Sequence, residues 1–397
     1  MIAKVESAYL KGELKAIPSK SYAHRIAICN YLANGTLSGG CDGFASNDIT
    51  ATLNCLENIK KGCGVLDVGE SGSTLRFMLP LCASLGGQYA FIGHGKLLER
   101  PNDELFSVMR EHGVSVEQSD KIYIDGFLTP GKFCLRGDIS SQYISGLLMA
   151  LPILDGDSEI VLTTPLCSAP YVEITLEVLK SFGIKIDREE NRFKILGGQT
   201  YLGGTTAEGD WSNLAFFLVG GAVNGDIRIT GLNPDSVQGD MFILDILRLA
   251  GVDILIENGC VSVKKSKIKA FEFSAKDCPD LVPIASVLGA YSDGKCVIKD
   301  VERLRIKESD RILSTITMLK AFNIRAESDG KNLVVYGGKP VGGEIDSFND
   351  HRLTMASAIL ALGAEGKAIL TRAEAINKSY PTFFEDYIKL GGVVQYV

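Results

Sequence analysis

Two kinds of hydrophobic segment alternate along the chain. The first is an apolar helix followed by a turn and a short β-like run, as in LCASLGGQYAFIG, LLMALPILDGDSEIVL, FFLVGGAVNGDIRITGL, IASVLGAYSDGKCVIKDV and ASAILALGAEGKAIL, with IAICNYLANGTLSGG as a sixth example. The second is an amphipathic helix that runs into a strand, as in DELFSVMREHGVSVE, EITLEVLKSFGIKID, MFILDILRLAGVDIL, ILSTITMLKAFNIRAE and FFEDYIKLGGVVQYV, with TLNCLENIKKGCGVL as a looser copy. The alternation predicts an α/β chain built from repeated helix–strand units.

The turn residues that close the second kind of segment recur at a regular spacing. They are Gly113, Gly183, Gly251, Asn323 and Gly391, with separations of 70, 68, 72 and 68 residues. Gly or Asn in the left-handed conformation ends a helix, and the β-branched run that follows is typical of a buried strand. We interpret the period as six units, each of two helices and three or four strands, in preference to coincidental spacing in an ordinary α/β chain. A chain of 397 residues suits two domains, so we expect three units in each.

Four of the apolar segments follow directly on an arginine. These are Arg25 before 26–32, Arg76 before 77–85, Arg311 before 312–319 and Arg352 before 353–362. A cation at a helix N-terminus costs up to ~1 kcal/mol, because the helix dipole is positive there. An anion bound where dipole, free N–H groups and guanidinium converge would explain the arrangement. The formal net charge of −7 argues against general attraction to polyanions, so we expect a confined site for a small, multiply charged substrate.

Composition excludes several classes of protein. The N-terminal stretch has no apolar signal-peptide core, and the longest apolar runs, such as 214–223, are too short for a membrane span. Ten cysteines are scattered without a C-x-x-C pair, which predicts a reducing, cytoplasmic setting without structural zinc. The acidic balance and the lack of a basic block make nucleic acid an unexpected partner.

In the first half of the chain, polar strings stand at the predicted helix starts. Lys20, Ser21 and Arg25 in IPSKSYAHR could together grip a phosphate, although capping by serine is the simpler alternative. Gly72 in GESGSTLR permits close approach of backbone N–H groups to an anion, or only a cap. Further candidates of the same kind are Arg100 in ERP, Ser140, Ser141 and Gln142 in SSQ, and Ser168 and Tyr171 in SAPY.

In the second half, acidic and basic residues accompany apolar helices. Asp280 precedes one such helix, where a helix cap and a functional carboxylate are equally good interpretations. Lys307, Glu308 and Arg311 lie together in RIKESDR, Arg352 ends NDHR, and Lys378 lies in NKSYP. The sequence contains no Ser-His-Asp order, metal-ligand spacing, Walker loop or G-x-G-x-x-G turn.

Taken in order, these strings resemble the enolpyruvyl transferases, and most closely the EPSP synthase (3-phosphoshikimate 1-carboxyvinyltransferase) family. The matching strings are SKSYAHR, ESGSTLR, ERP, SSQ, SAPY, EGD, QGD, PD, RIKESDR, NDHR and NKSYPTFF, and they span essentially the whole chain. The resemblance implies two similar domains, each of three βαβαββ units about a pseudo-threefold axis, with the active site in the cleft between them. It implies that residues 1–18 join 209–397 in one domain and that 19–208 form the other.

The resemblance also implies roles for individual residues. Contacts to shikimate 3-phosphate are expected from Lys20, Ser21, Arg25, Ser140, Ser141, Gln142, Ser168, Tyr171, Asp280 and Lys307. Contacts to phosphoenolpyruvate are expected from Lys20, Gly72, Arg100, Gln142, Arg311, Arg352 and Lys378. Catalytic roles are expected for Asp280, Glu308, Lys378 and Lys20. The chain departs from the family at Glu70, where Asn is common, at Ser73, where Thr is common, and at Arg303, near a common Asn.

The implied reaction joins the 5-hydroxyl of shikimate 3-phosphate to C2 of phosphoenolpyruvate and expels phosphate, without a metal or organic cofactor. It needs a base and an acid: Asp280 is the candidate base, and Glu308 and Lys378 are alternative acids. A transferase acting on UDP-N-acetylglucosamine is disfavoured, because its reactive cysteine has no counterpart between Cys82 and Cys134. A binding protein without catalysis would leave Asp280 and Glu308 unused. We expect a cytoplasmic monomer with small-molecule substrates as its partners and no membrane partner.

Overall fold

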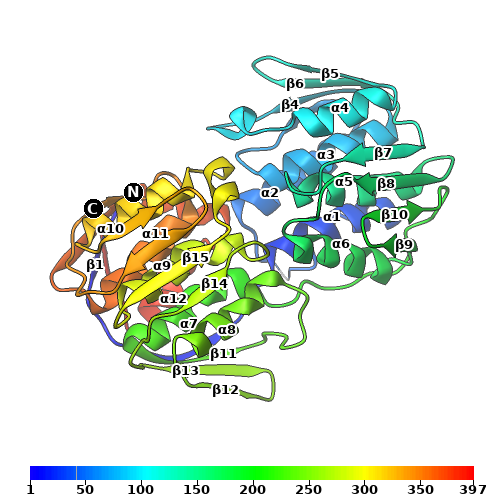
Figure 1. The fold of residues 1–397 in the computed structure, drawn as a ribbon. Helices are drawn as coiled ribbons and strands as arrows, with labels where there is room; N and C mark the ends of the chain where they lie inside the picture. Colours follow the sequence, from blue (N-terminus) through cyan, green and yellow to red (C-terminus); the bar gives the residue numbers. More distant parts are fainter. Residues whose placement is uncertain (42) are drawn as a thin grey trace. The chain divides into compact units, whose positions relative to one another are not determined.

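The computed structural model describes residues 1–41 and 43–397, which divide into two compact units (Figure 1). Unit 1 comprises Met1–Ile17 and Glu208–Val397, and unit 2 comprises Pro18–Ala207. The predicted domain boundaries, 18/19 and 208/209, differ from these limits by one residue. Within the described ranges, no helix is both long and apolar enough to cross a membrane.

Five four-stranded sheets in the described residues share one topology. In each repeat the first two strands pair in parallel, and the fourth strand lies between the second and third in antiparallel pairing. One helix connects the first strand to the second and another connects the second to the third. This is the βαβαββ order, so the predicted α/β fold class is confirmed. Five of the six predicted units have this order in the described residues, and the predicted third unit of unit 2 is present only as two helices.

Unit 2 contains two of these sheets and one additional helical pair. The first sheet belongs to β3 (Val65–Asp67), α3 (Gly72–Leu85), β4 (Gly87–Ile92), α4 (Asp103–Glu111), β5 (Val114–Gln118) and β6 (Ile122–Gly126). The second belongs to β7 (Lys132–Leu135), α5 (Ser141–Ala150), β8 (Ser158–Leu162), α6 (Ala169–Ser181), β9 (Ile186–Glu189) and β10 (Arg192–Ile195). The additional pair is α1 (Lys20–Asn34) and α2 (Asn47–Lys60), and no strand is assigned in the described part of 18–64.

Unit 1 contains the other three sheets. The first belongs to β2 (Leu10–Lys15), α7 (Trp211–Asn224), β11 (Gly225–Thr230), α8 (Ile243–Leu249), β12 (Ile254–Glu257) and β13 (Cys260–Lys264). The second belongs to β14 (Glu272–Ser274), α9 (Val282–Ala290), β15 (Lys295–Lys299), α10 (Arg311–Ala321), β16 (Ala326–Ser328) and β17 (Leu333–Tyr336). The third belongs to β18 (Glu344–Asp346), α11 (His351–Leu360), β19 (Lys367–Thr371), α12 (Phe383–Lys389), β20 (Val393–Tyr396) and the N-terminal β1 (Ile2–Glu6).

Short 3-10 turns carry several of the polar strings. They are η1 (Leu97–Glu99), η2 (Leu151–Ile153), η3 (Gly239–Phe242), η4 (Pro279–Leu281), η5 (Glu302–Ile306), η6 (Ala361–Gly363) and η7 (Ala373–Lys378).

The apolar helices form the centre of each unit. In unit 1, α7, α9 and α11 contact one another, and every residue of α9 is buried. In unit 2, α5 contacts α1, α3 and α6. Helices that are hydrophobic on all sides are stable only inside a core, which explains why the first kind of sequence segment carries so few surface residues.

The regularly spaced turn residues all adopt the predicted left-handed conformation. Their φ angles are 89° at Gly113, 77° at Gly183, 76° at Gly251, 60° at Asn323 and 97° at Gly391. In all five repeats the turn residue lies just after an outer helix and precedes a strand or a short extended stretch. The period read from the sequence is therefore a period of the fold.

The prediction that all four arginines begin their helices is wrong for two of them. Helix α1 begins at Lys20 and α3 begins at Gly72, so Arg25 and Arg76 lie one turn further along. Arg311 is the first residue of α10, and Arg352 is the second of α11. The polar residues ahead of the first two apolar runs are helical because the units bury them too, as they bury His24 and Thr74.

Candidate active site

Buried arginines link the helices of unit 2. Arg25 of α1 donates to Thr175 Oγ1 at 2.7 Å and to the Tyr171 carbonyl at 2.9 Å, both on α6. It also donates to Ser145 Oγ of α5 at 3.2 Å. Arg76 of α3 donates to Oε1 of Gln142, near the start of α5, at 2.7 Å. The structure therefore brings the predicted residues Arg25 and Tyr171 together.

Arg25 carries a charge that unit 2 leaves without a counter-ion. Its side chain is 2% exposed, and its hydrogen-bond acceptors are hydroxyl and carbonyl oxygens, including the Ser21 carbonyl at 2.6 Å. Among the residues the structure describes, no carboxylate lies within ion-pair distance of it. Burial lowers the pKa of Arg25 to about 10, so the guanidinium stays charged at neutral pH. An anionic ligand would supply the missing negative charge.

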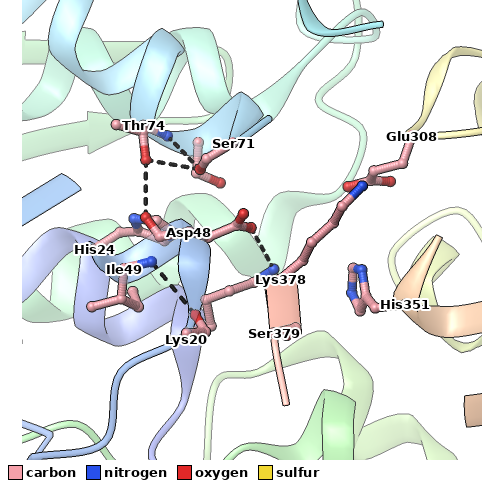
Figure 2. A network of polar contacts seen from close by, with 12 residues as sticks. Lys20, His24, Asp48, Ile49, Ser71, Thr74, Glu308, His351, Lys378 and Ser379 are labelled. Atoms are coloured by element: carbon pink, nitrogen blue, oxygen red, sulfur yellow. Dashed lines mark hydrogen bonds and ion pairs between the residues drawn. The ribbon is translucent and has the colours of Figure 1, made fainter. Parts of the chain in front are cut away.

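Lys20 has a carboxylate partner that the sequence analysis did not identify. Its Nζ lies 2.9 Å from Asp48 Oδ2, and both side chains are mostly buried (Figure 2). Lys20 is the first residue of α1, and Asp48 is the second of α2. The two residues are 28 positions apart in the chain, and their ion pair connects the starts of the two helices.

Gly72 and Arg100, both predicted to contact phosphoenolpyruvate, are neighbours. A Cβ atom added at Gly72 would lie 2.7 Å from Nη1 of Arg100. The Nε of Arg100 is buried and has no hydrogen-bond partner among the described residues. A missing partner for a buried donor indicates that a ligand completes the site. Glu70, where the family commonly has Asn, lies against Gly95: a Cβ there would be 2.8 Å from its Oε2.

The serines at the start of α5 have mixed roles. Ser140 Oγ accepts from the Gln142 backbone N–H at 3.3 Å, which is the capping alternative considered for this string. The Gln142 side chain donates to Ser73 Oγ at 2.9 Å, and so ties α5 to α3. Ser141 is 6% exposed and begins α5. Ser168 adopts the left-handed conformation directly before α6.

In unit 1, Asp280 lies among three cations. Its carboxylate is 2.8 Å from Arg311 Nη1, 2.9 Å from Arg352 Nη2 and 3.4 Å from Lys307 Nζ. It does not cap α9, whose cap position is Leu281, so the capping alternative is wrong. Burial alone would raise the pKa of Asp280, but the positive charges of Arg352, Lys307 and Arg311 lower it well below its usual value.

Arg311 is held by three carboxylates. Its Nε lies 2.7 Å from Asp350 Oδ2, and its other nitrogens reach Asp280 and, at 2.5 Å, Glu308 Oε2. Asp350 is fully buried and also caps α11 by accepting from the Arg352 backbone N–H at 3.0 Å. The guanidinium therefore fixes both the candidate base and one of the two candidate acids.

Lys378, the other candidate acid, lies at the end of η7. It is 8% exposed, and its Nζ donates to the Asn349 carbonyl at 2.6 Å. In Figure 2 its side chain extends toward the carboxylate of Glu308. The two alternative acids thus belong to one part of unit 1.

Arg303, where the chain departs from the family, lies in η5, four residues before Lys307.

Asp240 is a second buried carboxylate in unit 1 that the sequence analysis did not select. It is 4% exposed, and its Oδ1 has no hydrogen-bond partner among the described residues. Burial, followed by the negative charge of Asp280, raises the pKa of Asp240 to about 6. Its QGD string was noted only as part of the resemblance.

Comparisons with known proteins place these features in a family. The sequence profile of EPSP synthase (3-phosphoshikimate 1-carboxyvinyltransferase) matches residues 60–387. The 3-phosphoshikimate 1-carboxyvinyltransferase of Clostridium novyi is 36% identical over 98% of both chains. That of Clostridium kluyveri is 38% identical over 97% of this chain and 96% of its own. The chain belongs to the EPSP synthase family. The predicted transferase class is thereby confirmed.

Solved structures support the fold independently. EPSP synthase from Acinetobacter baumannii superposes with a TM-score of 0.81 over 100% of both chains at 23% identity. The enolpyruvyl transferase NikO from Streptomyces tendae superposes with a TM-score of 0.76 at 17% identity. At these identities the likeness concerns the fold alone. The sequence relatives, and not the architecture, distinguish EPSP synthase from other enolpyruvyl transferases.

Three carboxylates that the sequence analysis did not select lie beside candidate site residues. Asp350 lies inside the NDHR string, and its position directly before an apolar helix could have identified it from the sequence as a helix cap. Asp48 and Asp240 carried no comparable signal. Their importance follows from tertiary contacts with Lys20 and from proximity to Asp280.

Proposed function

We propose that Asp280, Glu308 and Lys378 handle the protons in the transfer of the enolpyruvyl group of phosphoenolpyruvate to shikimate 3-phosphate. The observation that carries the proposal is the position of Asp280, an ionised carboxylate held by Arg311, Arg352 and Lys307. An ionised carboxylate can accept the proton of the attacking 5-hydroxyl. A cap residue would have no need of three cations.

The substrates would also tune this base. Phosphoenolpyruvate carries phosphate and carboxylate charges, and Arg352 and Arg311 are its proposed ligands. An anion bound to these arginines offsets part of the positive charge that lowers the pKa of Asp280. Asp280 therefore becomes more basic when the substrate is in place, which is the state in which a base is needed.

The reaction proceeds by addition and elimination. The 5-hydroxyl oxygen bonds to C2 of phosphoenolpyruvate, its proton passes to Asp280, and C3 receives a proton from Glu308 or Lys378. The tetrahedral adduct then loses a proton from C3 and phosphate from C2, which leaves the enol ether. Arginine and lysine side chains stabilise the phosphate and carboxylate charges throughout.

The shikimate 3-phosphate ligands are proposed to be Lys20, Ser21, Arg25, Ser140, Ser141, Gln142, Ser168, Tyr171, Asp280 and Lys307. The buried Arg25, which lacks a counter-ion in unit 2, supports a phosphate there. The phosphoenolpyruvate ligands are proposed to be Lys20, Gly72, Arg100, Gln142, Arg311, Arg352 and Lys378. The adjacency of Gly72 and the unpartnered Arg100 Nε supports this second group.

The decisive experiment is phosphate release on mixing both substrates. We expect phosphate from the native protein and a loss of turnover of roughly 10²- to 10⁴-fold in Asp280→Asn, the usual scale for an acid–base group. Asp253→Asn, at an exposed position of the same unit, is the matched control and should keep its turnover. No phosphate from the native protein would refute the reaction. Near-native turnover in Asp280→Asn would refute only the assigned base.

A second experiment separates the two candidate acids. In deuterated water the acid delivers a deuteron to C3 of phosphoenolpyruvate, and reversal of the addition leaves label in recovered substrate. Glu308→Gln and Lys378→Met should differ, and the variant that loses labelling identifies the acid. Labelling that persists at the native rate in both variants would exclude both residues.

We further propose that the enzyme works in the cytoplasm as a monomer and without a metal or organic cofactor. All ten cysteines are free thiols, which suits a reducing compartment. Each unit buries its own apolar helices, so neither needs a second copy to cover a core. Light scattering of the purified protein tests the monomer, and activity after chelation tests the absence of a metal.

A further inference from the structure

A buried chain of hydroxyl groups joins three helices of unit 2 and ends on a histidine. His24 Nδ1 of α1 lies 2.7 Å from Thr52 Oγ1 of α2, which lies 2.7 Å from Thr74 Oγ1 of α3. Thr74 Oγ1 continues to Ser71 Oγ at 2.8 Å and to the Asp48 carbonyl at 3.2 Å (Figure 2). None of the assigned substrate ligands is a member of this chain.

The chain is closed to solvent. His24, Thr52, Ser71 and Thr74 are each at most 1% exposed. The ring of His24 also packs edge-on against Phe77 of α3, with centroids 6.2 Å apart. The charged groups nearby are Lys20 and Arg25 on α1 and Asp48 on α2. Burial, and then the positive charges of Lys20 and Arg25, lower the pKa of His24 well below its usual value, so the ring is neutral.

The surroundings of the ring decide which nitrogen carries its single proton. His24 Nε2 is buried and has no hydrogen-bond partner among the described residues. Nε2 has no partner in either tautomer, but a proton on Nε2 would leave a buried N–H unsatisfied, which is rarer in proteins than an unsatisfied acceptor, whereas a proton on Nδ1 is donated to Thr52. The Nδ1–H tautomer is therefore favoured.

This tautomer decides how the Thr52 hydroxyl is oriented. A hydroxyl has a single proton, so Thr52, which accepts from His24, donates that proton to Thr74 or to the Asp48 carbonyl at 3.4 Å. The opposite tautomer would require Thr52 to donate to His24, which leaves Thr52 no proton for either of these acceptors.

Both far ends of the chain hold residues assigned to phosphoenolpyruvate. Asp48, whose carbonyl accepts from Thr74, holds Lys20 through its carboxylate at 2.9 Å. Ser71 caps α3 by accepting from the Thr74 backbone N–H at 3.1 Å, directly before Gly72. The hydroxyl chain therefore connects the partner of Lys20 with the residue that directly precedes Gly72.

We propose that His24, as the neutral Nδ1–H tautomer, is a positioning residue that orients the Thr52 and Thr74 hydroxyls and thereby places Lys20 and Gly72 for phosphoenolpyruvate. The kinetic part rests on the proposed function of these two ligands. The tautomer itself rests only on the geometry of unit 2. Lys20 is a proposed ligand of both substrates and Gly72 of phosphoenolpyruvate alone, whereas Arg25, Tyr171 and the remaining ligands of shikimate 3-phosphate are not placed by the chain. Its disruption should therefore affect phosphoenolpyruvate more than shikimate 3-phosphate.

The first test is a long-range proton–nitrogen NMR spectrum of the full protein labelled at histidine. The chain has four histidines, and the His24 signals are those lost in His24→Gln. We expect a neutral ring with its proton on Nδ1 and no titration between pH 8 and about 5.5, below the ordinary histidine pKa. A proton on Nε2, or titration at the ordinary histidine pKa, would overturn the proposal without bearing on the reaction.

The second test is kinetic. Thr52→Val removes the hydroxyl but keeps the shape, and should raise the KM for phosphoenolpyruvate about 10-fold, with less than 3-fold change in the KM for shikimate 3-phosphate. Thr52→Ser should restore the native value, and Thr50→Val, at an exposed position of the same helix, should leave it unchanged. A folded Thr52→Val protein with native KM values would refute the positioning role. If the native protein releases no phosphate, the proposed function fails while the tautomer test stands.

Discussion

The two units hold buried arginines in opposite electrostatic settings. In unit 1, Arg311 is 1% exposed and lies against the carboxylates of Asp280, Glu308 and Asp350. In unit 2, Arg25 is equally buried, but the acceptors around it are neutral hydroxyl and carbonyl oxygens. The same side chain is compensated in one unit and uncompensated in the other.

The difference indicates two roles for a buried arginine. A compensated guanidinium already has its counter-ions, so it fixes the positions of carboxylates that move protons. An uncompensated guanidinium keeps an unsatisfied charge, which an anionic ligand can neutralise. We therefore propose that unit 2 supplies most ligands of the phosphate ester, and that unit 1 supplies the proton-transfer groups together with Arg311 and Arg352 for phosphoenolpyruvate.

Replacing each arginine by methionine tests the comparison most directly. Arg311→Met leaves the buried Asp350 and the partly buried Asp280 and Glu308 without their shared cation, and should lower the free energy of unfolding by roughly 3–5 kcal/mol. Arg25→Met removes an uncompensated buried charge and should cost much less. Denaturant unfolding at pH 7 measures both variants. Equal losses of stability in the two would show that the two settings are energetically alike.

Substrate binding should depend strongly on Arg25, although the stability of the protein should depend on it only weakly. A hydrogen bond to a charged group contributes about 1.5–3 kcal/mol, so Arg25→Met should raise the KM for shikimate 3-phosphate about 10- to 150-fold. The KM for phosphoenolpyruvate should change less, because Arg25 is not among its proposed ligands. Initial rates with each substrate varied in turn give both constants. A larger effect on phosphoenolpyruvate would contradict the division of roles.

The ionisation of Asp240 in unit 1 should make the stability of the protein depend on pH. An unfolded aspartate ionises near pH 3.9, whereas the pKa of Asp240 in the folded protein is raised to about 6. Between these values the unfolded chain releases a proton that the folded protein keeps, so stability falls as pH rises through this window. Asp240→Asn should therefore stabilise the protein by on the order of 1–3 kcal/mol at pH 8 and by little at pH 4. A gain that is the same at both values would exclude ionisation as its cause.

The smallest effect is expected at the contact between the backbone of Gly72 and the side chain of Arg100 in unit 2. Gly72→Ala puts a methyl group 2.7 Å from Arg100 Nη1, and the flexible end of that side chain must move. Since Ala favours a helix over Gly by about 0.5–1 kcal/mol, stability should not fall, while the KM for phosphoenolpyruvate rises a few-fold. The rise should shrink in an Arg100→Lys background. Additive effects in the double variant would mean that the two residues act separately.

Local patterns predicted most of the architecture. The five turn residues from Gly113 to Gly391 were identified because a left-handed residue between a helix and a strand is a local requirement. The alternation of two kinds of helix predicted units of two helices and three or four strands, and the βαβαββ order was implied by the family resemblance. Two helix starts were misplaced, because the sequence shows where Arg25 and Arg76 adjoin apolar runs but not that the residues before them are buried as well.

The sequence predicted candidate site residues but not which of them contact one another. The strings around Asp280 and Arg311 were visible, yet the choice between cap and functional carboxylate for Asp280 depended on cations 27, 31 and 72 residues away in the chain. The partnership of Lys20 with Asp48 and the contact of His24 with Thr52 each join different helices. Such pairings depend on how helices pack, and periodicity does not report them.

The position of β1 has a consequence for the order in which the chain can fold. Strand β1 comes before unit 2 in the chain, whereas its partners β19 and β20 come after unit 2. Ala3 of β1 pairs with Leu370 of β19 and with Tyr396 of β20. Unit 2 is continuous and can finish while the ribosome is still making unit 1. At about 5–20 residues per second, β1 waits roughly 20–80 s for its neighbours. During that time β1 is an unpaired strand, and its free backbone N–H and C=O groups can pair with other chains. It has to remain unpaired until β19 and β20 of the last repeat have been made.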